Sequence, residues 1–299
     1  MKSRSLTSFL ITAGLVLLLL GAVALIKGCG GSRVVRVDTP LPKDFPAQGF
    51  SHAVFESLLQ EYVDDEGRVA YRLWHDNAGD MARLDSYLAA LARYSPLNAP
   101  ERFPAQSARL AYWLNAYNAS VIKGVLLHWP LHSVNDVKAR LQLKQGQGFF
   151  HELGFVLGQK TYSLLQIENE QIRKPFQDAR IHFVLNCASG SCPALRPELP
   201  KGPQLETYLA DATARFVSDP SNVRVDSEAR KVYLSAIFDW YADDFLNDLR
   251  RRGKPAPDLI AYVRDVAPPA LQAQLEGAQE YEVVFLDYDW SVNGLGDGP

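Results

Sequence analysis

Cysteine and methionine are scarce in this sequence, whose 299 residues include three cysteines and two methionines. So few thiols exclude a small scaffold held together by many disulfides. Cys187 and Cys192 are separated by four residues, a spacing typical neither of a thioredoxin motif nor of a common zinc knuckle. We therefore predict no metal site from the cysteines.

The sequence also lacks a long basic stretch and the common nucleotide-binding motifs. Its net charge is −3 and its pI is about 6.1, so we predict no nucleic-acid partner. The GxGxxG, P-loop, GxSxG and HExxH patterns are all absent. Their absence excludes the usual dinucleotide, P-loop, α/β-hydrolase and zincin sites, and we predict no cofactor.

One long hydrophobic run is present, close to the N-terminus. Residues 9–26 carry no charge, and about 20 apolar residues are enough for a helix that spans a bilayer. Lys2 and Arg4 precede this run, as in an export signal. Three outcomes stay open: an uncleaved anchor, a cleaved signal, or a lipoprotein modified at Cys29, although Lys27 lies where a small or apolar residue is usual. We expect the rest of the chain to be held at the inner membrane and to face the periplasm.

Composition divides the chain into four parts. We predict a membrane anchor or signal at residues 1–28, a tether rich in proline and glycine at 29–49, a single domain at 50–293 and a tail at 294–299. The domain is long enough to build one hydrophobic core. The expected partners are the membrane, through the N-terminal segment, and an envelope protein or peptide.

Hydrophobic periodicity predicts an α+β fold for the domain. Apolar residues recur at helical spacing before residue 145, and we expect a nearly uniformly apolar helix over 105–127 at the centre of the core. Hairpin-type strands dominate afterwards, so we expect a helical N-terminal half packed on a mostly antiparallel sheet. Other expected elements are helices over 54–62, 81–94 and 236–274, hairpins over 149–163 and 223–234, a helix capped by Ser163 and Gln166, a buried strand over 181–185 and a last strand over 281–287.

The most informative stretch is a buried apolar run that leads into a loop of small residues with a cysteine at each end, Cys187 and Cys192. The loop backbone can approach a ligand closely, and its amides, beside Ser189 and Ser191, could line an anion or oxyanion site. Three states of the thiols stay open. They are a reactive thiol at Cys187, a disulfide that suits an oxidising compartment, or two inert buried cysteines.

A nucleophilic Cys187 needs a base, and His182 lies five residues before it. Side chains alternate along a strand, so the two would share a face only if the strand ends at Asn186. Asn186 would then lie on the face of His182 and could orient its ring. His182 is therefore the candidate base or orienter.

Two amides interrupt the apolar helix, at Asn115 and Asn118. They are three residues apart and therefore neighbours on one face of the helix. A buried amide without a partner costs several kcal/mol, roughly 2–7, so both must find one. They could bond nearby loop backbone and lock the fold, or one could face the cysteine loop as an oxyanion donor or orienter.

Asp287 and Asp289 lie at the end of the last predicted strand. If the strand persists, the two carboxylates share a face roughly 7 Å apart. There they could bind a cation or orient a histidine. The simpler alternative is that they are solvated or hold neighbouring loop amides.

These stretches together resemble the family known as domain of unknown function 547. The resemblance rests on separate motifs in the family's order, at residues 112–119, 165–168 with Arg173, 181–187, 191–193, 237–241 and 287–290. They cover most of residues 50–293 and add Glu168, Arg173 and Trp290 to the candidate site. The family has no assigned activity, so the resemblance implies little chemistry. Some relatives carry serine at the position matching Cys192, which favours Cys187 acting alone.

The sequence therefore leaves competing hypotheses about function. The first is a cysteine-dependent enzyme, papain- or transglutaminase-like in layout, in which Cys187 is the nucleophile. Its supporting groups would be His182, Asn115, Asn118 and Asp289. The alternatives are a non-catalytic envelope binding module, or a thiol–disulfide protein that uses both cysteines. Candidate binding residues are Glu168, Arg173, Ser189, Ser191, Cys192, Asp287 and Trp290.

Overall fold

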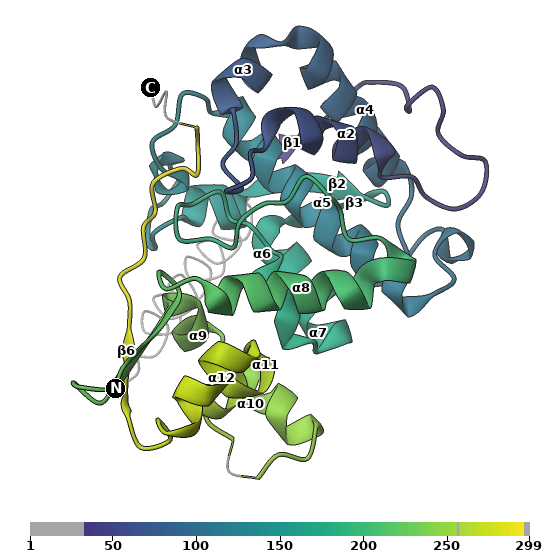
Figure 1. The fold of residues 1–299 in the computed structure, drawn as a ribbon. Coiled ribbons are helices and arrows are strands. Elements are labelled where there is room, and N and C mark those ends of the chain that lie inside the picture. The colour runs from purple at the N-terminus through teal and green to yellow at the C-terminus, as the bar shows by residue number, and fades with distance from the viewer. Residues whose placement is uncertain (1–32, 256, 296–299) are drawn as a thin grey trace, which may run out of the picture. The chain divides into compact units, whose positions relative to one another are not determined.

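The computed structural model of the protein describes residues 33–255 and 257–295 (Figure 1). The predicted membrane segment at residues 9–26 and the alternative lipidation site Cys29 lie outside them. Within the described part of the chain, no helix combines the length and the apolar composition that crossing a bilayer requires. Residues Val34–Pro299 make up one compact unit.

The N-terminal half of this unit is helical, as the sequence predicts. It contains α2 (Ala53–Tyr62), α3 (Tyr71–Asp76), α4 (Ala78–Arg93) and α5 (Gln106–Leu127), which confirms the helices expected over 54–62, 81–94 and 105–127. Every residue of α5 from Leu110 to Leu126 is buried. Figure 1 shows why: α5 passes between α4 and α8, so no face of it is left to solvent.

The end of the predicted tether is packed against these helices. The ring of Phe45 stacks on that of Tyr94, with centroids 5.7 Å apart. The guanidinium of Arg102 donates hydrogen bonds to the carbonyls of Ala47 and Gly49 at 2.9 and 2.7 Å. Residues 45–49 are therefore held in place by contacts with the helical half.

The hairpin expected over 149–163 is confirmed in its second part. Strands β2 (Leu153–Leu157) and β3 (Lys160–Ser163) pair antiparallel and form a sheet in the order β1–β2–β3 with β1 (Arg33–Val35). Gly158 and Gln159 both have positive φ, 54° and 68°, as a two-residue type I′ turn requires. The preceding residues Gln147–Glu152 form a π-helical turn.

The predicted helix cap at Ser163 is also confirmed. The Ser163 hydroxyl accepts from the Gln166 N–H at 3.2 Å, and the Gln166 amide accepts from the Ser163 N–H at 3.0 Å. This reciprocal pair opens the short helix α6 (Leu164–Gln166). A π-helical segment, Ile167–Arg173, and α7 (Lys174–Phe176) continue it.

The buried strand expected over residues 181–185 is wrong. The chain forms a 3-10 helix at Ala179–Phe183 instead, and it remains almost fully buried. A short continuous apolar run indicates burial on all sides, but it does not distinguish a strand from a buried helical turn. The helical path changes which side chains share a face, so the parity argument that related His182 to Asn186 no longer applies.

The C-terminal half contains helices α8 (Leu205–Ser218), α9 (Ala236–Trp240), α10 (Ala242–Arg251), α11 (Leu259–Val266) and α12 (Pro269–Glu276). The second predicted hairpin is confirmed as β4 (Val223–Asp226) and β5 (Lys231–Leu234). The last strand, β6 (Glu282–Phe285), pairs parallel with β5. The fold is thus α+β, with its strands in two small three-stranded sheets rather than in one.

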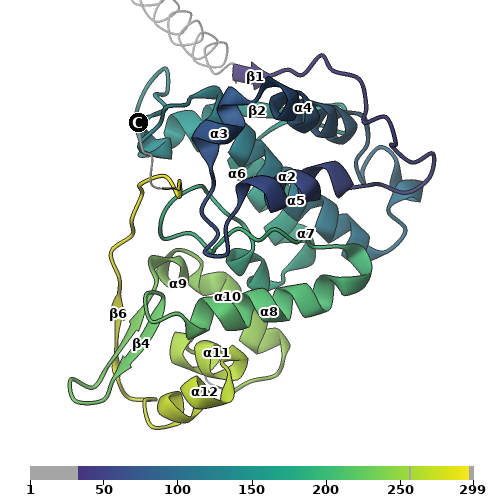
Figure 2. The same cartoon turned by 45° about the horizontal axis from the view of Figure 1, so that its top comes forward.

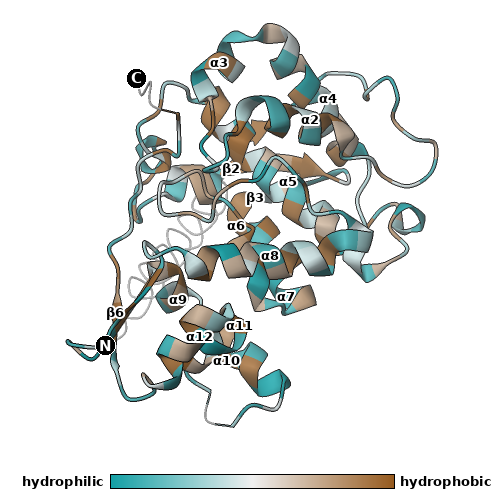
Figure 3. Ribbon diagram, viewed as in Figure 1, coloured by the Kyte–Doolittle hydropathy of each residue, from teal (hydrophilic) through white to brown (hydrophobic). Residues whose placement is uncertain are grey.

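Two hydrophobic clusters fill the unit. The larger one surrounds α5 and the β2–β3 hairpin, and the smaller one lies among α8 to α12 and the second sheet. Figure 2 shows α11 and α12 below α8, and Figure 3 shows brown positions mixed with teal ones along α2 and α8, as in amphipathic helices. The segment around the 3-10 helix belongs to both clusters, because Ile181, Val184 and Leu185 pack into the first and Phe183 into the second.

The hairpin turn gives a test of the fold. Gly158→Ala is expected to lower the free energy of unfolding by about 2 kcal/mol or more. The left-handed conformation disfavours a side chain by about 1–2 kcal/mol, and a Cβ would lie 2.0 Å from the Ser95 hydroxyl. Urea denaturation measures the change. Gln159→Gly is the control, because Gln159 is exposed and the change relieves the same strain. Equal losses in both variants would contradict this account of the turn.

Candidate functional site

A pocket of about 190 Å³ lies where the two hydrophobic clusters meet. Each separate motif of the family resemblance contributes to its lining. Representative residues, one from each motif, are Tyr117, Glu168, His182, Cys192, Trp240 and Trp290. Larger clefts, such as one of about 560 Å³ beside Arg173 and Arg251, contain no cysteine. The aromatic pocket is therefore the candidate site.

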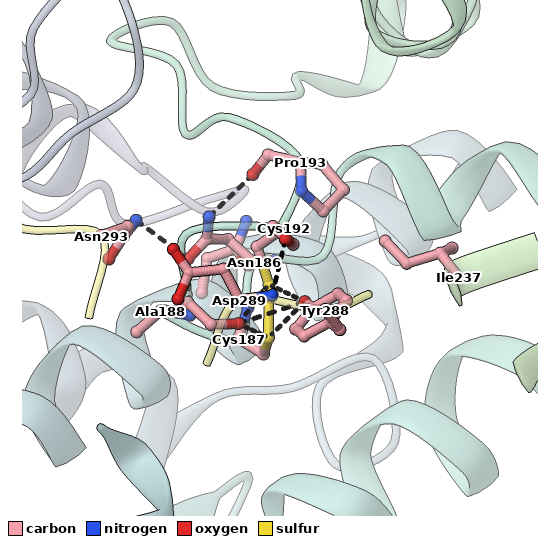
Figure 4. The surroundings of a disulfide bond; sticks show 12 residues. Asn186, Cys187, Ala188, Cys192, Pro193, Ile237, Tyr288, Asp289 and Asn293 are labelled. Carbon is pink, nitrogen blue, oxygen red and sulfur yellow. Dashed lines mark hydrogen bonds between the residues drawn. A yellow bond between two sulfur atoms is a disulfide. The ribbon is translucent and has the colours of Figure 1, made fainter. Parts of the chain in front are cut away.

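Cys187 and Cys192 form a disulfide, with Cα atoms 6.2 Å apart (Figure 4). Of the three states that the sequence leaves open, the structure shows the bonded one. Neither sulfur is a free thiol, so Cys187 is not a nucleophile in this state. Both cysteines are half-buried and line the pocket, so the bond is part of the pocket wall.

The base of the disulfide loop is closed by a second device, the side chain of Asn186. Its amide nitrogen donates to the Pro193 carbonyl at 2.7 Å, and its oxygen accepts from the Ala188 N–H at 2.8 Å. Ala188 has a φ of 62°, a left-handed conformation that is unfavourable for alanine. The bond from Asn186 to Pro193 spans the same gap as the disulfide, from one end of the loop to the other (Figure 4).

The tip of the loop is held by the C-terminal segment. Gly190 N–H donates to the Ser291 carbonyl at 2.8 Å, and Ser191 N–H donates to the Asp289 carbonyl at 3.2 Å. Asp289 N–H returns a bond to the Ser191 hydroxyl at 2.9 Å. A Cβ on Gly190 would lie 2.6 Å from an Asp289 carboxylate oxygen, so a larger residue here would force the Asp289 side chain to shift. The loop is thus fixed at its base and tip by hydrogen bonds.

Hydroxyl groups surround the two sulfurs. The Tyr288 hydroxyl lies 3.2 Å from Cys187 Sγ and 3.1 Å from Cys192 Sγ, and the Ser189 hydroxyl lies 2.8 Å from Cys187 Sγ. Ser189 donates to the Tyr288 oxygen at 3.1 Å. Burial raises the pKa of Tyr288 to about 12, so its own proton is available to a sulfur at neutral pH. Cys192 Sγ also accepts the backbone N–H of Cys187 at 2.9 Å.

His182 lies in the same pocket, but its hydrogen bond goes elsewhere. Its Nε2 lies 2.7 Å from Asp244 Oδ2, and the same oxygen accepts from Arg173 Nε at 2.7 Å. The imidazole stacks on the Tyr241 ring with centroids 3.8 Å apart. Among the described residues no hydrogen bond joins His182 to Cys187, so the expected cysteine–histidine pair is not formed here.

The two helix amides bind backbone rather than the cysteines. Asn115 donates to the Pro200 carbonyl at 3.0 Å. Asn118 donates to the Val184 carbonyl at 3.1 Å and accepts from the Asn186 N–H at 3.0 Å. Both therefore lock the fold, and Asn118 positions the start of the cysteine loop. The structure places neither one as an oxyanion donor.

Of the remaining candidate residues, some line the pocket and others are exposed to solvent. Strand β6 ends at Phe285, so Asp287 and Asp289 do not continue a strand face, and both are exposed. Asp289 holds loop amides, accepting from the Ser291 N–H at 2.8 Å. Trp290 lines the pocket, as does the buried Glu168. No group of acidic, histidine or cysteine side chains suited to a metal occurs among the described residues.

Several site residues were not predicted as such. Tyr241 and Tyr288 lie inside the quoted motifs, and the sequence alone gave no reason to separate them from packing aromatics. Asp244 lies on an amphipathic helix, where an acidic side chain is expected to face solvent. Its partner His182 is 62 residues away in the sequence. Only the tertiary structure brings these groups together.

Comparison with known proteins agrees with the resemblance over part of the chain. The model of a family described as "Protein of unknown function, DUF547" matches residues 101–217. The matched region contains the cysteine loop, Glu168 and His182. The motifs at 237–241 and 287–290 lie beyond it. No curated protein and no solved structure matches the chain.

The ion-pair cluster around Asp244 gives a test of pH dependence. Burial alone would raise the pKa of Asp244, but the hydrogen bonds and charges of His182 and Arg173 lower it well below its usual value. A depressed pKa stabilises the fold at pH values above about 3.9, and this contribution is lost as the pH falls further. Asp244→Asn is therefore expected to cost about 1–3 kcal/mol at neutral pH and less in acid.

Urea denaturation between neutral pH and about pH 2 measures this loss. Asp243→Asn is the matched control, because Asp243 is the exposed neighbour on α10. A cost for Asp244→Asn that stays constant over this pH range would contradict the ion-pair account.

Proposed function

We propose that this chain is an envelope protein that carries out thiol–disulfide exchange through Cys187 and Cys192. The observation that carries the proposal is the position of the disulfide, with both sulfurs in the wall of the aromatic pocket. The uncharged segment at residues 9–26 supports export to the envelope, and exported compartments are those in which disulfides persist.

The exchange step transfers two electrons to the protein from a substrate dithiol, or from two molecules of a substrate with one thiol. A substrate thiolate attacks one sulfur of the pair, the S–S bond breaks, and the other sulfur leaves as a thiolate. The second substrate thiolate then attacks the mixed disulfide. The substrate becomes a disulfide, and the protein retains two thiols after taking up two protons. A second disulfide substrate restores the protein by the same reaction in reverse.

The hydrogen bonds favour Cys192 as the leaving sulfur. A leaving thiolate is stabilised by N–H and O–H donors, as any buried charge is. The Ser189 and Tyr288 hydroxyls lie close to both sulfurs, and Cys192 Sγ accepts in addition the Cys187 backbone N–H at 2.9 Å. Attack at Cys187 would therefore form a mixed disulfide there, with Cys192 released.

A purely structural role explains the disulfide less well. Closing so short a loop adds only about 2 kcal/mol to stability by loss of chain entropy. The loop is already fixed by Asn186 at its base and by residues 289–291 at its tip. Breaking the bond therefore leaves the loop held, which a protein that cycles between two redox states needs.

Equilibration with glutathione mixtures, followed by alkylation and mass spectrometry, tests the proposal. We expect a reduction potential for Cys187–Cys192 above about −300 mV, in the range of exchange-active pairs. We also expect Cys192→Ser to accumulate a mixed disulfide at Cys187 with a thiol substrate, because the resolving sulfur is gone.

The Cys187→Ser variant is the control, and we expect it to trap much less. The double variant Cys187→Ala with Cys192→Ala should keep the fold and lose about 2 kcal/mol of stability. A potential well below about −300 mV together with no trapping would leave only a structural bridge, and with it the binding-module hypothesis.

A further inference from the structure

A buried carboxylate distinguishes this pocket from an ordinary aromatic one. Glu168 is 7% exposed and lines the pocket together with Tyr117 and Tyr241. Burial first, and then the charge of Glu168 and a hydrogen bond to it, raise the pKa of Tyr241 well above its usual value. The Tyr241 hydroxyl and the Glu168 carboxylate therefore lie near each other in the pocket lining.

The cations near Glu168 are already engaged. Arg173 donates through Nε to Asp244 at 2.7 Å and through Nη1 to Asn169. His182 shares the same Asp244 oxygen at 2.7 Å. Arg173 and His182 thus share the carboxylate of Asp244. Glu168 lies near the Tyr241 hydroxyl in the pocket lining, and the structure shows no ion pair between Glu168 and another residue of that lining.

Three aromatic rings form another part of the lining. The centroids of Trp240 and Tyr288 are 4.6 Å apart, those of Tyr288 and Trp290 are 4.7 Å apart, and those of Trp240 and Trp290 are 5.6 Å apart. Trp240 is 46% exposed although it is a large aromatic residue, so the cluster is open on one side. An open aromatic cluster attracts a cation through its ring quadrupoles, and tryptophan does so best.

We propose that the pocket binds an ammonium group, held between Glu168 and the rings of Trp240, Tyr288 and Trp290. A buried carboxylate is stable when a positive group compensates it, and an ammonium ion supplies that charge while its carbon substituents cover the rings. A neutral ligand such as a sugar could stack on Trp240 but would form no ion pair with Glu168. The volume of about 190 Å³ suits a small group, since an engineered cavity of about 150 Å³ accommodates benzene.

The position of the site beside the disulfide identifies a substrate class. Cys187 and Cys192 line the same small pocket, so a thiol that reacts with them would have to place its ammonium group within that pocket. Such a substrate is an aminothiol or a peptide with a lysine next to a cysteine. This second step rests on the proposed thiol–disulfide function, whereas ammonium binding does not.

Choline and its neutral isostere 3,3-dimethyl-1-butanol test ammonium binding on the oxidised protein, by tryptophan fluorescence and calorimetry. We expect choline to bind at least ten times more tightly than the alcohol. Glu168→Gln should abolish that preference, and Trp240→Leu should weaken choline binding. Glu170→Gln is the matched control, because Glu170 is exposed on the same helical segment and does not line the pocket. Equal binding of the two probes, or a preference that survives Glu168→Gln, would overturn the proposal.

Reduction rates test the substrate class. Cysteamine is compared with mercaptoethanol, and acetyl-Lys-Cys-amide with acetyl-Gln-Cys-amide, each corrected for its own thiolate fraction. We expect the cationic thiol of a pair to react at least ten times faster, and only in protein that retains Glu168. Faster reduction by acetyl-Lys-Cys-amide than by acetyl-Gln-Cys-amide would indicate a peptide substrate. Faster reduction by the cationic thiol in the cysteamine pair alone would indicate a small aminothiol.

The two proposals fail separately in these experiments. Selective choline binding with a disulfide that no thiol reduces would keep the ammonium site and overturn the exchange function. Rapid reduction by all four thiols, together with equal binding of choline and its neutral isostere, would keep the exchange function and overturn the ammonium site.

Discussion

The side chain of Asn118 connects the central helix to the candidate site. Its amide donates to the Val184 carbonyl and accepts from the Asn186 N–H, at 3.1 and 3.0 Å, and Asn118 and Asn186 are both almost fully buried. Hydrogen bonds in such surroundings are costly to leave unmade, because water cannot replace the missing partner. They fix the backbone where the chain leaves the 3-10 helix and enters the cysteine loop, and they thereby set the position of Asn186, which closes the loop at Pro193.

This connection decides where the pocket lies. The segment anchored by Asn118 runs between the two hydrophobic clusters, and its side chains divide between them. Its path leaves a small volume at the boundary, lined in part by α9 and by the C-terminal segment at residues 288–290. The walls therefore come from regions that are distant in sequence, so the shape of the pocket depends on how the two clusters pack. A change within one cluster would be felt at the disulfide without touching it.

Local sequence signals predicted the elements that local physics decides. Helix α5, the β2–β3 and β4–β5 hairpins and the cap at Ser163 depend on periodicity, turn residues and neighbouring hydrogen bonds, and all are confirmed. The 3-10 helix at Ala179–Phe183 was missed because a strand and a helical turn that are buried on all sides have the same continuous apolar sequence. Periodicity then does not distinguish between them. The bond between His182 and Asp244 joins residues too distant in sequence for any spacing rule. The disulfide stayed one of three alternatives, since spacing permits a bridge without requiring it.

Charge connects the two functions proposed for the pocket. Reduction of the disulfide would place a thiolate beside the hydroxyls of Ser189 and Tyr288, in the same small volume that Glu168 lines. An ammonium group bound there interacts with one negative charge in the oxidised protein and with two once a thiolate has formed. Binding and redox state are then linked, and linkage is reciprocal: a ligand that prefers the reduced form also makes the disulfide easier to reduce. A cationic substrate would thus promote its own oxidation by occupying the site. After release of the oxidised product, the reduced protein would no longer be stabilised by the ligand and would be reoxidised more easily.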